Sequence, residues 1–185
     1  MVGYNINNMG LFSALSGKIY RFNSINQHID NRIAAIIKGL EDTAERFLLI
    51  AAFGITQEMI GQIFHPDRGM FKKSLNSLTA ESLERVYYIL LDLSVSSIMK
   101  LPLNIDEKNI IDGLSKVSGQ STDKTAIDIV SYTKADSGVL EAYEKTCLTL
   151  GIQDDSQTAI LFGTTFIKTY SEVVEKIGHA VYGNG

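Results

Sequence analysis

The stretch ERFLLIAAFGITQEMIGQIF, residues 45–64, contains an apolar run from Phe47 to Ile55. The first part of the stretch is apolar almost all round, which predicts a helix buried at the centre of the protein. Gly54 then precedes Thr56, and a glycine permits a turn while a threonine can cap a new helix. The stretch therefore predicts two helices that meet at Gly54, in a helix-turn-helix arrangement.

The rest of the chain also shows helical spacing of apolar residues, and strict alternation is scarce. Of the 185 residues, 45% are hydrophobic and 21% are charged, which is close to the average for globular domains. Only two prolines occur, Pro66 and Pro102, so few helices are interrupted. These features predict an all-α, multi-helix bundle with a helix-turn-helix in its first half.

The segment KLPLN, residues 100–104, breaks the helical pattern and is the candidate boundary within the chain. Residues 1–100 then form an N-terminal helical portion, with the helix-turn-helix at 43–64. Residues 104–185 form a C-terminal helical bundle and a candidate assembly module.

The last expected helix, which begins after Asp154, carries apolar or small residues at alternating spacings of three and four. Such a stripe predicts a seam against another helix, either within the chain or on a partner subunit. The residues predicted to bind a partner are Ile160, Ile167, Tyr170, Val174, Ile177 and Val181.

Charge is distributed unevenly along the chain. Residues 1–100 hold ten Lys+Arg and nine Asp+Glu, a net +1, whereas residues 101–185 hold seven and twelve, a net −5. Because nucleic-acid affinity depends strongly on neutralised phosphates, the first half is the candidate for contact with DNA. The small positive balance indicates that a partner or an oligomer would be needed.

Within the first half, the candidate recognition helix supplies polar side chains that can pair with base edges. Thr56 caps this helix, and Gln57, Glu58 and Gln62 face outward. The helix has no basic residue, so the phosphate contacts are expected from the following segment. Those contacts are predicted for Arg68, Lys72 and Lys73.

The segments AAFGITQEMIGQIFHPDRG (51–69) and SLTAESLERVYYILLDL (77–93) resemble the helices of λ-repressor-like (Xre) domains. This resemblance covers roughly residues 30–95. It implies that Thr56 caps a DNA-recognition helix.

The segments AERFLLIAAFGITQEM and SLTAESL also resemble FlhD, an all-α subunit of bacterial transcription activators. That second resemblance implies action in a complex with another protein that helps to hold DNA.

The sequence offers little support for enzymatic chemistry. The single cysteine, Cys147, excludes an internal disulfide and a multi-thiolate metal site. His28, His65 and His179 lack the spacing of metal ligands, and phosphate-binding glycine motifs are absent. We therefore predict no enzyme, no cofactor, no metal site and no small-molecule substrate.

Two functional hypotheses follow from these patterns. The first is a non-enzymatic, DNA-associated subunit of a transcription regulator that acts with a partner or as an oligomer. The alternative is a helical adaptor or structural subunit of a larger assembly, with no DNA contact.

A cytoplasmic location is expected, because the nine-residue apolar run is shorter than the roughly 20 residues of a membrane span and no secretory signal is visible. A third hypothesis places residues 9–22 on a membrane surface.

Overall fold

The computed structural model describes residues 7–64, 78–101, 104–153 and 157–182. These residues form seven α-helices and no strand, so the all-α prediction is confirmed. The helices are α1 (Asn7–Lys38), α2 (Ala44–Ile63), α4 (Ala80–Met99), α5 (Glu107–Ser118), α6 (Thr122–Thr133), α7 (Ala135–Leu150) and α8 (Gln157–Tyr182).

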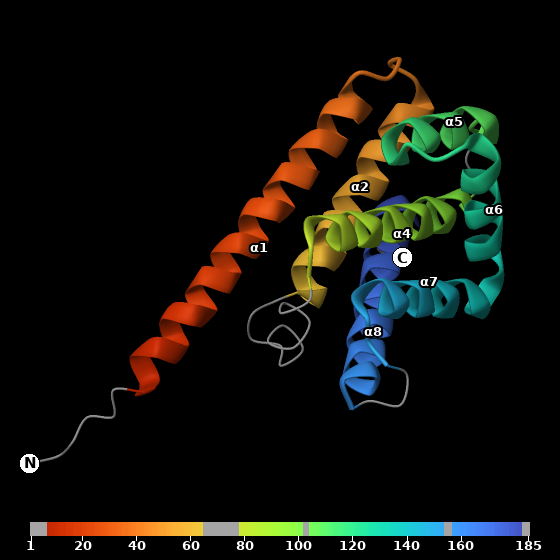
Figure 1. The fold of residues 1–185 in the computed structure, drawn as a ribbon. Coiled ribbons are helices and arrows are strands. Elements are labelled where there is room, and N and C mark those ends of the chain that lie inside the picture. The colour runs from red at the N-terminus through yellow and green to blue at the C-terminus, as the bar shows by residue number, and fades with distance from the viewer. Residues whose placement is uncertain (1–6, 65–77, 102–103, 154–156, 183–185) are drawn as a thin grey trace, which may run out of the picture.

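Helices α2 and α4 lie at the centre of the bundle (Figure 1). Helix α4 packs against α2, α6 and α7, while α2 also contacts α1, α5 and α8. The N-terminal half of α1 extends away from the other helices, whereas its C-terminal half packs on the bundle through Ile29, Ile33 and Ile37.

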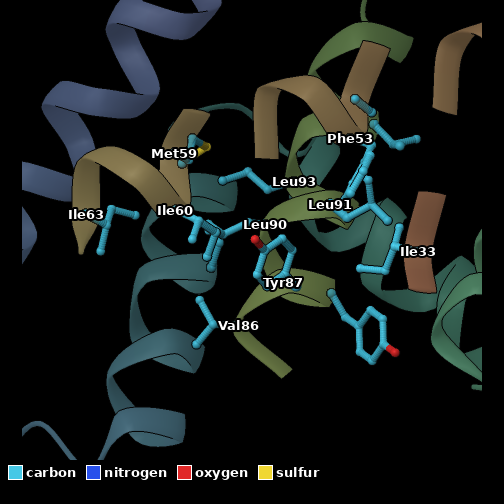
Figure 2. Packing of buried hydrophobic residues seen from close by; sticks show 14 of the residues in the cluster. Ile33, Phe53, Met59, Ile60, Ile63, Val86, Tyr87, Leu90, Leu91 and Leu93 are labelled. Carbon is cyan, nitrogen blue, oxygen red and sulfur yellow. The ribbon is translucent and has the colours of Figure 1, made fainter. Parts of the chain in front are cut away.

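The interface between α2 and α4 includes several fully buried aliphatic side chains (Figure 2). Met59 and Ile60 of α2 lie close to Leu90 and Leu93 of α4. Burial of an aliphatic side chain of this size contributes about 1.5–3 kcal/mol, so this interface provides much of the stability of the fold.

One hydrophobic cluster includes residues from both sides of the predicted boundary at 100–104. From the second half, Ile110 of α5, Ile129 of α6 and Phe162 of α8 belong to the same cluster as the α2 and α4 residues. The N-terminal and C-terminal portions therefore share one core.

The predicted turn at Gly54 is not formed, because α2 runs through this position as one continuous helix. Thr43 is the N-cap of α2, and its side chain accepts a hydrogen bond from the backbone N–H of Arg46. Among the described glycines, only Gly119 and Gly151 have positive φ angles. The helix-turn-helix prediction for residues 43–64 is therefore wrong.

Thr56 has a role different from the predicted helix cap. It is fully buried in the middle of α2, and its hydroxyl donates to the carbonyl oxygen of Ala52 at 2.9 Å. The same hydroxyl lies 3.3 Å from Ser94 Oγ of α4. Threonine can form this bond to the preceding turn inside a helix, so its presence did not require a helix start.

We predict that Gly54→Ala stabilises the protein by about 1 kcal/mol, because alanine is the better residue inside a helix. A Cβ atom at Gly54 meets nothing within 4 Å. Gly119→Ala is the matched control, since φ at Gly119 is 67° and alanine should destabilise the protein there. Urea unfolding of both variants measures the difference. Destabilisation by Gly54→Ala would support a turn at this position instead.

Candidate protein-interaction site

The polar residues predicted to face DNA bases lie beside α8. Gln57 is exposed, but the carboxylate of Glu58 forms an ion pair with Lys176 of α8. The side-chain amide of Gln62 donates to Glu58 at 3.1 Å, and its oxygen accepts from the Thr169 hydroxyl at 3.4 Å. Two of the three predicted base-reading side chains therefore take part in the contact between α2 and α8.

The predicted phosphate contacts Arg68, Lys72 and Lys73 lie outside the described residues. The exposed side of α2 instead presents apolar and small residues. Phe47 is 64% exposed and Ile50 is 45% exposed, and Gly54 lies on the same side of the helix. The described part of this surface supplies no cation for a phosphate backbone.

Helix α8 has two contrasting sides. Its inner side buries Phe162, Phe166 and Val173. The rings of Phe162 and Phe166 lie 5.7 and 5.9 Å from the ring of Tyr143 in α7, measured between centroids. These aromatic contacts fix which side of α8 turns toward the bundle.

The opposite side of α8 carries a regular stripe of exposed residues, which we call the α8 face: Ile160, Thr164, Ile167, Ser171 and Val174. Ile160 is 67% exposed, Ile167 is 41% exposed and Val174 is 38% exposed. The positions are separated by alternating steps of four and three, so they share one side of the helix. Large aliphatic residues thus alternate with small hydroxyl residues along the stripe.

The structure divides the six predicted partner-binding residues. Ile160, Ile167 and Val174 belong to the α8 face. Tyr170 is half-buried, and its hydroxyl lies 2.7 Å from Ser97 Oγ of α4, so it contributes to packing within the chain. The side chains of the remaining two, Ile177 and Val181, lie outside the described set.

Two opposite charges flank the α8 face on the same side. Lys168 and Glu175 are one heptad apart, and their side chains are 69% and 71% exposed. Each lies near another polar side chain on α8: Lys168 is 3.7 Å from Glu172, and Glu175 is 3.7 Å from His179. Exposed pairs of this kind contribute little and can exchange partners.

Other apolar side chains are exposed on other helices: Ile127, Val130, Leu140 and Leu148. Single exposed apolar residues are common on protein surfaces and need no special role. The exposed side of α2 has a similar spacing, but only two of its residues, Phe47 and Ile50, are large and apolar, whereas the α8 face has three at helix-pairing positions.

The described residues give no sign of a metal site or a membrane span. They contain no group of three or more His, Cys, Asp or Glu side chains that could hold an ion. None of the described helices is long and apolar enough to cross a membrane. Cys147 is buried in α7.

The chain was compared with protein-family models, with curated proteins and with solved structures, and no match was found in any of the three. In the part of the chain that the structure describes, the fold is all-α, and the α8 face turns a regular stripe of aliphatic and hydroxyl side chains to solvent.

Proposed function

We propose that the protein is a non-enzymatic subunit of a protein assembly, which associates through the α8 face. The observation that carries this proposal is the exposure of Ile160, Ile167 and Val174 at heptad spacing on one helix. The transcription-regulator hypothesis depended on a separate recognition helix, and α2 is continuous. The adaptor alternative is therefore the better supported of the two.

A second copy of this chain fits the α8 face in an antiparallel arrangement. If the two-fold axis passes near Ser171, Ile167 of one helix lies opposite Val174 of the other. Small residues such as Thr164 and Ser171 allow the helices to approach closely. An isologous pair of this kind brings the same surface of both subunits together.

Charge complementarity also favours the antiparallel pair. In that register Lys168 of each subunit lies beside Glu175 of the other, so two inter-subunit ion pairs form. A parallel, in-register pair would place Lys168 at the level of its own copy, and neither ion pair would form. Flanking charges commonly set the orientation of paired helices.

We predict that Ile167→Glu weakens self-association by about a hundredfold, because each of the two subunits would lose roughly 1.5 kcal/mol of apolar burial. Ile127→Glu is the matched control, since Ile127 is 68% exposed on α6, away from the α8 face. Sedimentation equilibrium measures both variants. A wild-type protein that stays monomeric, or equal losses in the two variants, would contradict the proposal.

A charge exchange tests the antiparallel orientation separately. Lys168→Glu and Glu175→Lys should each weaken self-association at low salt, because like charges then meet across the pair. An equimolar mixture of the two variants should form a heterodimer with both ion pairs restored. Self-association of the wild type without this rescue would reject the antiparallel register but retain the α8 face.

A further inference from the structure

A hollow of about 430 Å³ lies between α4, α6 and α7, on a part of the molecule separate from the α8 face. Apolar groups of Tyr88, Ile89 and Leu148 form part of its wall. Leu148 is 80% exposed, so the hollow is open to solvent beside this residue. Asp92 of α4 also lines the hollow.

Asp92 is only 5% exposed, although it carries a carboxyl group. Among the described residues, no side chain or backbone N–H donates a hydrogen bond to that carboxyl. Burial raises the pKa of Asp92 to about 8, and the nearby carboxylate of Asp128 acts in the same direction. The side-chain oxygen of Gln120 is a second buried acceptor without a partner within the described structure.

The cations around Asp92 already have anionic partners. Lys124 and Lys145 contact the Asp128 carboxylate at 2.8 and 2.9 Å, and Lys145 also contacts Glu141 at 3.0 Å. At the edge of the hollow, Arg85 pairs with Glu81 at 2.7 Å, while Lys145 lies 4.7 Å from the centre of the Tyr132 ring. The charges of Lys124 and Lys145 act on Asp92 as well and oppose the effect of burial on its pKa, but neither lysine donates a hydrogen bond to its carboxyl.

We propose that this hollow binds an organic amidinium or ammonium ion with an apolar body. Its cationic head donates hydrogen bonds to the Asp92 carboxylate, which otherwise lacks donors, in a hollow that the Gln120 side chain also lines. Its body packs against Tyr88, Ile89 and Leu148. A carboxylate ligand fits less well, since Lys124 and Lys145 already bind Asp128.

Binding of the cation requires Asp92 to lose its proton, so affinity should depend on pH. Asp92 faces Lys124, Asp128 and Tyr132 from α6 and Lys145 from α7. Below pH 8 most of the carboxyl is protonated. The dissociation constant should therefore fall by up to tenfold for each pH unit between about pH 6 and 8 and then level off.

Titration calorimetry with benzamidine, which combines an amidinium with an aromatic ring, tests the proposal. Benzamide is the matched neutral probe and should not bind detectably. The Asp92→Asn variant should lose benzamidine binding, and its unfolding transition shows whether it is folded. Leu140→Glu should bind benzamidine like the wild type, because Leu140 is exposed on α7 and does not line the hollow. Equal binding of the two probes, binding retained in folded Asp92→Asn, or affinity independent of pH would overturn the proposal.

Discussion

Replacing Asp92 by asparagine is expected to raise the free energy of unfolding at pH 7 by about 2–4 kcal/mol. The pKa of Asp92 is about 8 in the folded protein, compared with 3.8 for an ordinary aspartate. Between these two values the unfolded chain has released the proton while the folded protein still holds it. The folded state therefore loses stability relative to the unfolded state as pH rises through this range.

The pH profile distinguishes this effect from a general improvement in packing. The advantage of Asp92→Asn should grow by up to about 1.4 kcal/mol per pH unit between pH 5 and 8, because asparagine does not titrate. Urea unfolding of the wild type and of Asp92→Asn at three pH values measures this difference in the free energy of unfolding. A constant difference across this range would show that Asp92 is not protonated in the folded protein.

Asp128 provides the opposite control. Hydrogen bonds from Lys124 and Lys145 lower the pKa of its carboxyl, in spite of the opposing effect of partial burial. Its contribution to stability is therefore present above the ordinary aspartate pKa and is lost as the solution becomes more acidic. Asp128→Asn should destabilise the protein at pH 7, whereas Asp92→Asn should stabilise it.

Ligand binding would explain why the protein retains a buried carboxyl that lowers its stability. Natural proteins retain destabilising groups at sites where those groups contact a ligand. The side chains of Asp92 and Gln120 line the same hollow, and the oxygens of both lack donors within the described part of the chain. The loss of protein stability caused by Asp92 in the absence of a ligand and the proposed cation site therefore have the same structural origin.

Periodicity in the sequence predicted the helices well, but it also contained the evidence against the turn at Gly54. Leu49, Ala52, Thr56, Met59 and Ile63 are all buried, and they follow one helical phase across the glycine. A true turn would have shifted that phase. Gly54 lies on the exposed side, where a glycine weakens a helix without ending it.

The sequence was less informative about which apolar side of the last helix faces solvent. Ile160 and Ile167 lie seven residues apart and Phe162 and Phe166 lie four apart, so both pairs follow helical spacing. The choice depends on Tyr143, which belongs to a different helix and contacts both phenylalanines. One feature of the sequence could have indicated that Asp92 is a buried acidic residue: it is the only acidic residue in the apolar run VYYILLDLSV, residues 86–95.

The connection between α6 and α7 is unusually tight, and Gly138 lies at its closest approach. Lys134 alone separates the two helices and is the C-cap of the first and the N-cap of the second. The backbone N–H of Gly138 donates to the carbonyl oxygen of Lys134 at 2.9 Å. The first turn of α7 therefore passes directly over the last turn of α6.

We expect Gly138→Ala to destabilise the protein by about 3 kcal/mol, because overpacking against backbone cannot be relieved by side-chain rotation. A Cβ atom at Gly138 would lie 2.3 Å from the carbonyl oxygen of Tyr132 and 2.8 Å from its carbonyl carbon. The two helices must move apart to admit it. Because Tyr132 lines the hollow beside Asp92, the same movement should also weaken benzamidine binding.

Gly61→Ala is the matched control for this change. Gly61 also lies inside a helix, but a Cβ atom there meets nothing within 4 Å. Alanine should therefore stabilise α2 by about 1 kcal/mol through its helix propensity alone. Urea unfolding of the two variants separates propensity, which favours alanine at both sites, from the clash, which occurs only at Gly138. A Gly138→Ala protein as stable as the wild type would mean that α6 and α7 do not approach as closely as the Lys134 connection places them.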